Sequence, residues 1–290
     1  MNLSIDCSLS LYPDDSTLFF SGTCASVIAT RLSLELSKCQ KWLVENKLSL
    51  HLGKTECLLF GSRGKLKRAD EFTIHCEGKA IQRVTHVKYL GAQLDANLNG
   101  SIHVSGVLKT CMARLSFLYR NSNLLDSNLR KMLCMSLIQP YMDHCASSWY
   151  SSINSALRLK LDVLQRKMVR FIYNFEFTKH VGYSELKSLS WLSVPDRVKF
   201  FKLVHVFRIK HGLAPSYLTT HFTSVSDTHS YHTRGSVSNF HVSKSVAIAP
   251  TTFAVTGIRH WNELPGHLKL IDSLKVFKRK LRAYLLDGYD

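Results

Sequence analysis

The sequence predicts an α+β fold in which short antiparallel strands and one helix come first and further helices follow. Up to Asp95, short apolar segments alternate with turn residues such as Glu77-Gly78, a pattern that is typical of strands and hairpins. After Asp95, apolar residues recur at three- and four-residue spacing, which is typical of amphipathic helices. These two patterns place the change from strands to helices near Asp95.

Composition and charge favour a globular protein with a polyanionic partner. The chain has 290 residues, of which 45% are hydrophobic and 20% are charged, which argues against disorder over most of its length. Lys and Arg number 38 against 21 Asp and Glu, giving a formal net charge of +17. Nucleic acid is the natural partner for such a charge, and an acidic membrane surface is the alternative. No apolar run approaches the roughly 20 residues that span a bilayer, and we expect no membrane partner.

The cysteines and histidines predict neither disulfides nor a structural zinc site. The eight cysteines are scattered, none forms a C-x-x-C pair, and no secretory signal precedes them. The 14 histidines also lack the paired spacing of zinc ligands. We therefore expect reduced, mostly buried thiols in a protein that is intracellular, in the nucleus or the cytoplasm, and not secreted.

The first element is predicted to be a hairpin over residues 11–20, with Asp14 and Asp15 at its turn. Adjacent carboxylates repel each other, so they are most easily held together when a divalent cation lies beside them. Nucleotidyl transfer uses paired metal ions at sites of this kind. The alternative is an ordinary solvated turn, because Pro13-Asp14-Asp15-Ser16 is also good turn composition.

The remaining N-terminal elements follow from local patterns. Ile28, Leu32 and Leu36 lie on one helical face and predict a helix that begins near Cys24 and reaches Leu43. The elements predicted after it are a loop over 46–53, a strand over 57–60, a basic connection over 62–70, a hairpin of 72–76 with 79–84, and a strand over 87–94.

Beyond Asn97 the chain is predicted to be helical, apart from a long, flexible loop over 215–245 that is rich in Ser, Thr and His. Asp126 or Ser127 is the N-cap expected for the second helix, and Pro140 interrupts that helix. The helices are predicted over 103–120, from 126 or 127 to about 140, over 156–174, over 193–212 and over 273–286.

Basic residues lie beside the apolar stripe of two predicted helices. In one interpretation these side chains face phosphates and hold nucleic acid without reading its sequence. In the alternative they solubilise a helical bundle, and the last helix also has the composition of a membrane-surface helix, although docking on the bundle is favoured. The residues are Arg158, Arg166, Lys167 and Arg170 on the helix over 156–174, and Lys275, Lys278, Arg279 and Arg282 on the helix over 273–286.

Several segments, in order, resemble the reverse transcriptase of non-LTR retrotransposons of the LINE type, jockey-like in form. Residues 11–20 resemble motif C, whose usual core in that family is Tyr-Ala-Asp-Asp. Residues 42–61 resemble the motif D region, and residues 87–95 resemble motif E, the primer grip. Trp261-Asn262-Glu263-Leu264-Pro265 resembles a segment near the end of such polyproteins. The resemblance covers essentially the whole chain.

The resemblance implies a partial palm with motifs C, D and E over residues 1–96, a helical thumb-like bundle over 97–175, and a basic helical C-terminal region over 176–290. The implied partners are an RNA template, a DNA primer and the product duplex, and the implied cofactor is Mg²⁺ in the intact family. The resemblance implies that Asp14 is a Mg²⁺ ligand and that Asp15 is a nearby carboxylate with a less certain metal contact. It implies that Lys54 approaches the pyrophosphate leaving group, and Lys47 competes for this assignment. It also implies that Tyr89, Leu90 and Gly91 form the primer grip.

The sequence also departs from that family. Only Met1 to Leu11 precede Tyr12, the lone Asp6 lacks the surroundings of motif A, and Pro13 replaces the usual alanine. We therefore expect a C-terminal fragment of an RNA-directed DNA polymerase that begins just before motif C. Without motif A and the fingers, we expect it to be inactive alone. The alternatives are a non-catalytic, sequence-independent nucleic-acid-binding module and a degenerate retroelement relic.

Overall fold

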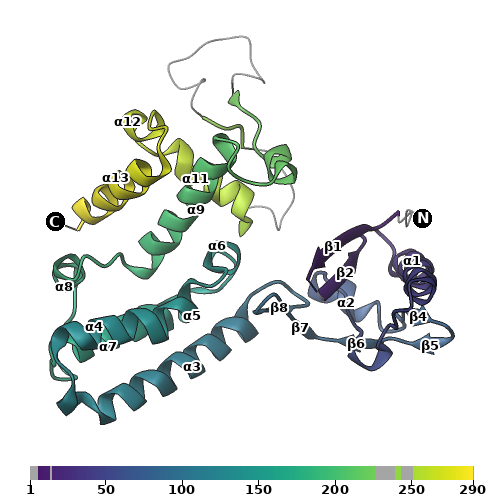
Figure 1. The fold of residues 1–290 in the computed structure, drawn as a ribbon, viewed down its shortest axis with the longest axis horizontal. Coiled ribbons are helices and arrows are strands. Elements are labelled where there is room, and N and C mark those ends of the chain that lie inside the picture. The colour runs from purple at the N-terminus through teal and green to yellow at the C-terminus, as the bar shows by residue number, and fades with distance from the viewer. Residues whose placement is uncertain (1–5, 14, 226–238, 243–250, 290) are drawn as a thin grey trace. The chain divides into compact units, whose positions relative to one another are not determined.

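The computed structural model describes residues 6–13, 15–225, 239–242 and 251–289. It divides into two compact units, Met1–Leu98 and Asn99–Asp290, which are called unit 1 and unit 2 below and are described separately. Figure 1 shows the described strands of unit 1 and the helices of unit 2. Among the described residues of unit 2, β pairing is limited to an isolated antiparallel bridge between Ser224 and Phe240. Whether the strands of unit 1 form a reverse-transcriptase palm stays a prediction.

Unit 1 is built from short strands and one long helix, α1. Its described strands pair two by two: β1 with β2, β4 with β5 and β7 with β8 are antiparallel, and β3 with β6 is parallel. The elements are β1 (Ser8–Tyr12), β2 (Asp15–Phe19), α1 (Ala25–Glu45), the 3₁₀ turn η1 (Leu52–Lys54), β3 (Glu56–Leu58), α2 (Arg63–Lys67), β4 (His75–Cys76), β5 (Lys79–Ala80), β6 (Gln82–Val84), β7 (His86–Tyr89) and β8 (Ala92–Asp95).

The hairpin predicted over 11–20 is confirmed as β1 and β2. Tyr12 pairs with Asp15, and Leu11 pairs with Ser16, so a two-residue connection joins the strands. Asp15 is therefore the first residue of β2 rather than a turn residue. Asp14 lies outside the described residues.

Helix α1 confirms the helix predicted from Cys24 to Leu43, and the main core of unit 1 lies against it. Ile28 is buried in this core, and Leu32 and Leu36 pack against it. The apolar stripe read from the sequence is thus the face that contacts the strands. The buried members of the core are Ile28, Cys57, Ala69, Phe72, Ile74, Cys76 and Ile81.

Three predictions in unit 1 need correction. The hairpin predicted from 72–76 and 79–84 is limited to β4 and β5, because Gln82–Val84 forms β6, which pairs in parallel with β3. The basic connection over 62–70 contains a short helix, α2, whose first turn is capped by the Ser62 hydroxyl accepting from the backbone N–H of Lys65. The strand predicted over 87–94 is a hairpin of β7 and β8, with Leu90 and Gly91 at its tip. Both tip residues have positive φ, 45° and 85°, as a two-residue hairpin turn of the primed type requires. The apolar run hid this turn, because leucine is rare in that conformation.

Unit 2 is helical over almost all of its described length. The long helices α3, α7, α9 and α13 are predicted from the spacing of apolar residues, whereas the shorter α6, α8, α11 and α12 are not. The elements are α3 (Ser101–Arg120), the 3₁₀ turn η2 (Ser122–Leu124), α4 (Ser127–Leu133), the π-helical turn η3 (Cys134–Ile138), α5 (Gln139–Asp143), α6 (Ala146–Trp149), α7 (Ser155–Tyr173), α8 (Tyr183–Ser188), α9 (Val194–Lys210), the 3₁₀ turn η4 (Ser216–His221), α11 (Phe253–Asn262), α12 (Gly266–Lys269) and α13 (Leu274–Asp287).

Two helix starts of unit 2 follow the capping rules closely. Asp126 caps α4 by accepting from the backbone N–H of Leu129 at 2.7 Å, and Asn154 caps α7 in the same way. Pro140 lacks a backbone N–H, and the π-helical turn η3 lies immediately before the helix that contains it. The predicted interruption near Pro140 is thus confirmed.

Two hydrophobic clusters form the interior of unit 2, and α9 contributes to both. The first cluster joins α3, η3 and α7, where the predicted stripe Leu157, Leu161, Leu164, Met168 and Phe171 is buried. The second cluster joins the rest of α9 to α11 and α13. Of the long loop predicted over 215–245, the described part holds η4 and the Ser224–Phe240 bridge, and residues 226–238 and 243–245 lie outside the described residues.

The cysteines are free thiols, as the sequence predicts. Cys7, Cys57, Cys76, Cys111 and Cys134 are buried. Burial raises the pKa of the Cys111 thiol to about 11 and that of the Cys134 thiol to about 12. Within the described residues, no helix is both long and apolar enough to cross a membrane.

Candidate nucleic-acid interface

The paired carboxylates of the motif C resemblance are only half described. Asp15 is exposed at the start of β2, opposite Tyr12, and Asp14 lies outside the described residues. Among the residues that the structure describes, no group of three or more His, Cys, Asp or Glu could hold a metal ion. The described residues therefore do not assemble a Mg²⁺ site. Magnesium binding stays a prediction that rests on Asp14 and Asp15.

The residues predicted to form a primer grip lie beside the hairpin predicted to be motif C. The Tyr89 hydroxyl, at the end of β7, is 3.1 Å from the Ser10 hydroxyl in the middle of β1. Leu90 and Gly91 follow at the tip of the β7–β8 hairpin, where Leu90 is exposed. The structure thus brings together two segments that are 79 residues apart in sequence.

The two lysines that compete for the motif D role are both exposed. Lys54 is the last residue of η1, and Lys47 follows the end of α1 with a positive φ of 58°. Neither is held by a carboxylate among the described residues. Burial and pairing do not distinguish them, and the role of Lys54 stays a prediction.

The basic residues of α7 divide into two kinds. Arg158 donates to the Ser151 carbonyl at 3.0 Å and lies over the Tyr150 ring, and Arg170 donates to the Lys179 carbonyl at 2.8 Å. These two guanidinium groups hold neighbouring loops. Arg166 is exposed and Lys167 is half-buried. Of the four predicted contacts, Arg166 is the one that the structure leaves most open to a ligand.

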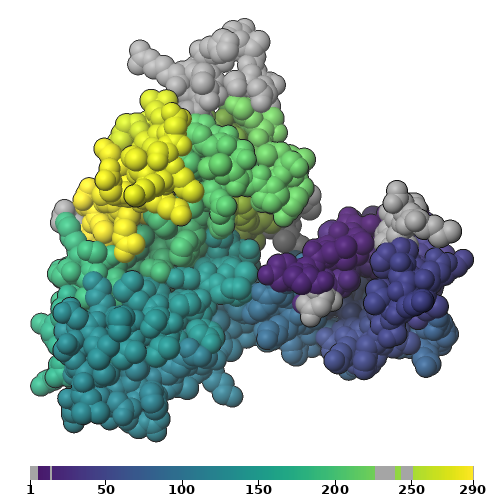
Figure 2. All heavy atoms as spheres, in the orientation of Figure 1, coloured from purple at the N-terminus to yellow at the C-terminus, as the bar shows by residue number. Residues whose placement is uncertain are grey.

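Helix α13 presents a cationic face outward and an apolar face inward. Phe277, Leu281 and Leu285 are buried in the second cluster of unit 2, which confirms that the helix docks on the bundle. Figure 2 shows the C-terminal segment, in yellow, on an outer face of unit 2. The exposed cations on this face, called the α13 cationic face below, are Lys275, Lys278, Arg279 and Lys280.

One predicted residue of α13 serves the fold, and one had been missed. The half-buried Arg282 donates to the Ser190 carbonyl, and burial lowers its pKa. Lys280 had been overlooked although it is exposed beside Arg279. The run Lys278-Arg279-Lys280 is a sufficient signal for it, since three consecutive helical positions cannot all face the core.

Arg130 on α4 is a structural residue that the sequence did not reveal. It is buried and donates to the carbonyls of Phe171 and Ser122 and to the side-chain oxygen of Asn174, at 2.9–3.1 Å. Its acceptors come from distant segments, so local spacing carries no signal for its burial.

The Trp-Asn segment near residue 261 is also structural. Trp261 has no exposed surface, and the Asn262 side chain donates to the Phe240 carbonyl at 2.8 Å and accepts from its N–H at 3.0 Å. The Lys269 ammonium donates to the Asn262 carbonyl at 2.8 Å. This segment therefore ties the Ser224–Phe240 bridge to the end of α11.

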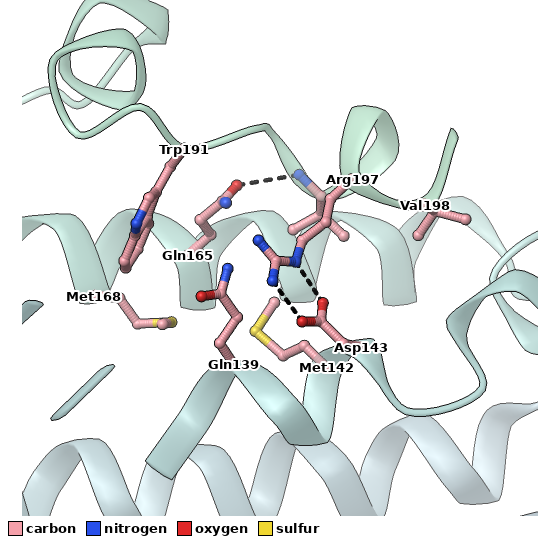
Figure 3. A pocket seen from close by; sticks show the side chains of 9 residues that line it. Gln139, Met142, Asp143, Gln165, Met168, Trp191, Arg197 and Val198 are labelled. Carbon is pink, nitrogen blue, oxygen red and sulfur yellow. Dashed lines mark hydrogen bonds and ion pairs between the residues drawn. The ribbon is translucent and has the colours of Figure 1, made fainter. Parts of the chain in front are cut away.

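The enclosed cavity between α5, α7 and α9 is too small for a substrate (Figure 3). Its volume is about 10 Å³, roughly that of one water-sized probe. Arg197 forms a two-point ion pair with Asp143 at its edge. Gln165 donates to the Leu192 carbonyl and accepts from the Val194 N–H. These bonds fasten α9 to the bundle, so the cavity belongs to the architecture, and the candidate interface is a surface.

Comparison with known proteins gives a distant relative. The chain is 26% identical over 148 residues to a protein of Nasonia vitripennis that is described as a retrovirus-related Pol polyprotein from type-1 retrotransposable element R1 3. The match covers 49% of this chain and 39% of that protein, so it spans well under half of the relative's length. No protein-family model matches the chain, and no solved structure does. The similarity supports a retrotransposon-related origin.

Proposed function

We propose that this chain derives from the reverse-transcriptase part of a non-LTR retroelement Pol protein. We further propose that it binds nucleic acid through unit 2 and does not extend primers on its own. The α13 cationic face carries the proposal. Its four exposed cations follow one another within two turns, and no ion pair joins them to a carboxylate among the described residues. Their helix is held in place by its buried apolar face.

Such a surface suits phosphates rather than bases. Lysine and arginine side chains on one helix face reach backbone oxygens without a fixed hydrogen-bond pattern, so affinity depends little on sequence. Neutralising about four phosphates predicts a slope of about −3 to −4 when the logarithm of the binding constant is plotted against that of the salt concentration. Between 50 and 200 mM salt, the affinity is then expected to fall about 100-fold.

A charge-matched pair of variants tests the location of the interface. The first variant changes Lys275, Lys278, Arg279 and Lys280 to glutamine. The second changes four exposed cations of unit 1 to glutamine: Arg63, Lys65, Lys67 and Arg68. Fluorescence anisotropy with a labelled duplex should show a weaker salt dependence for the first variant and a nearly unchanged one for the second. The reverse result would move the interface to unit 1, and no binding at low salt would reject the proposal.

Primer extension tests the catalytic part. With a homopolymer template and Mg²⁺ or Mn²⁺, we expect no extension by the chain, because the sequence supplies no motif A surroundings for a third metal-binding aspartate. The control variant is Asp14→Ala. Extension by the unchanged chain that this substitution abolishes would contradict the proposal and would identify a working polymerase site.

A further inference from the structure

Lys202, in the middle of α9, is a buried cation without a carboxylate partner among the described residues. Its side chain is 1% exposed. Its ammonium lies 2.5 Å from the Ser151 hydroxyl, between α6 and α7, and 2.8 Å from the Thr256 hydroxyl on α11. Burying an ammonium is costly unless an anion or several dipoles compensate for its charge. Here, the two neutral hydroxyls are the groups that compensate for it among the described residues.

A second cation adds to this charge. The Arg158 guanidinium donates to the carbonyl of Ser151, the residue whose hydroxyl accepts from Lys202. The Nε of Arg158 is buried and has no hydrogen-bond partner among the described residues. Burial and the Arg158 charge together lower the pKa of Lys202 to about 8. No ion pair joins either cation to a carboxylate among the described residues.

The hydrogen bonds of the cluster leave donors in excess. The Thr256 hydroxyl donates to the Thr252 carbonyl at 2.8 Å, so its hydrogen is engaged. The Ser151 hydroxyl accepts from Lys202, and its own hydrogen has no acceptor among the described residues. The third hydrogen of the Lys202 ammonium likewise lacks a described acceptor. The Ser151 hydroxyl, the Lys202 ammonium and the Nε of Arg158 thus each have a hydrogen without an acceptor among the described residues.

We infer that Lys202, Ser151 and Arg158, with Thr256 fixing the lysine, form a binding site for a phosphoryl oxyanion. An oxyanion accepts several hydrogen bonds and supplies the missing negative charge, and phosphate binds most strongly where charged donors converge. Ser151 and Arg158 are half-exposed, so an anion reaches the cluster from their side. The site is separate from the α13 cationic face, and it does not depend on the proposed function. The phosphoryl group belongs either to a nucleic-acid backbone or to a free phosphate.

Thermal unfolding of the full chain with inorganic phosphate tests the site. Chloride keeps the ionic strength constant in a buffer without other oxyanions. At a phosphate concentration about tenfold above its dissociation constant, the midpoint should rise by about 4 °C. Ser151→Ala, which removes one small hydroxyl, and Lys202→Met, which keeps the length of the side chain, should abolish this rise. Lys199→Met, a control on the same helix, should retain it.

The outcomes that overturn the inference are equally direct. No rise in the unchanged chain, or an equal rise in the Ser151→Ala and Lys202→Met variants, excludes the site. Ser151→Ala keeps the test valid if Lys202→Met fails to fold.

A second arm identifies the source of the phosphoryl group. If the backbone of a nucleic acid occupies the site, Ser151→Ala weakens duplex binding several-fold and phosphate competes with the duplex. If a free phosphate occupies it, duplex affinity is unchanged in that variant while the phosphate-dependent rise is lost. Glutamine substitution of the α13 cationic face should leave the phosphate-dependent rise intact, which separates this inference from the proposed function.

Discussion

The two units differ in how completely they bury their side chains. In unit 2, Phe171, Phe207, Trp261 and Phe277 have no exposed surface. In the described part of unit 1, the side chain with no exposed surface is that of Glu35, a carboxylate held by Lys38 at 2.9 Å and by the backbone N–H of Asp6. The unit that carries the polymerase-like motifs is thus the unit with the weaker apolar interior.

The strands of unit 1 show the same contrast. Each described strand pairs with one partner, and a two-stranded hairpin is marginally stable by itself. Leu11, Tyr12 and Phe19 on the β1–β2 hairpin are 54–69% exposed. The hairpin that resembles motif C therefore has little apolar support, whereas the α13 cationic face lies on a well-packed bundle. This contrast supports the proposal that the chain binds nucleic acid through unit 2 and does not extend primers on its own.

Dividing the chain should give the largest effect. Residues 99–290 alone should unfold cooperatively, because both hydrophobic clusters of unit 2 are contained in them. Residues 1–98 alone should show no cooperative transition, since their interior is small. Circular dichroism during thermal unfolding measures both. A sharp transition in residues 1–98 at the midpoint of the intact chain would contradict the claim that unit 1 has the weaker apolar interior.

Single truncations should reproduce the contrast on a smaller scale. Trp261→Ala in unit 2 should cost about 3–5 kcal/mol of unfolding free energy, because it opens a cavity among fully buried side chains. Leu11→Ala in unit 1 should change that free energy by no more than about 0.5 kcal/mol, since Leu11 is 69% exposed. Urea unfolding gives both values. Similar costs for the two substitutions would mean that the β1–β2 hairpin is buried in solution.

Acid should weaken unit 2 through histidines whose pKa is lowered by partial or full burial. Burial lowers the pKa of His103, His211 and His260 below the ordinary value of 6.5. As the pH falls below 6.5, the unfolded chain therefore takes up protons before the folded one does, and stability decreases. The urea midpoint of residues 99–290 should be lower at pH 5.5 than at pH 7.5. An unchanged or higher midpoint at pH 5.5 would contradict this sign.

Thiol chemistry should give the smallest perturbation and still distinguish the units. Cys24 in unit 1 is exposed, and a hydrogen bond from the Ser26 hydroxyl lowers the pKa of its thiol. Cys111 and Cys134 in unit 2 are buried. Brief treatment with iodoacetamide at pH 7.5, followed by mass spectrometry, should modify Cys24 first and these two last. Early modification of Cys134 would show that the first cluster of unit 2 opens readily.

Local patterns predicted those parts of the fold that depend on one segment. The α7 stripe and the apolar face of α13 follow from spacing, and the cap Asp126 follows from residue type. The hairpin tip at Leu90 was missed, because a leucine there takes a conformation that its neighbours impose.

The candidate sites were predicted less fully. The burial of Arg130 and Lys202 could not be predicted, because their partners lie 8–54 residues away and a basic residue on a helix usually faces water. The α13 cationic face was found because charge beside an apolar stripe is a local signal.

Residue-resolved lysine footprinting tests the central claim most directly. The full chain is acetylated briefly at low salt with and without a 20-bp duplex, and each lysine is quantified by mass spectrometry. The account predicts that the duplex protects Lys275, Lys278 and Lys280 of unit 2 several-fold more than Lys65 and Lys67 of unit 1. Protection confined to Lys65 and Lys67, or equal reactivity of all five with and without the duplex, would contradict it.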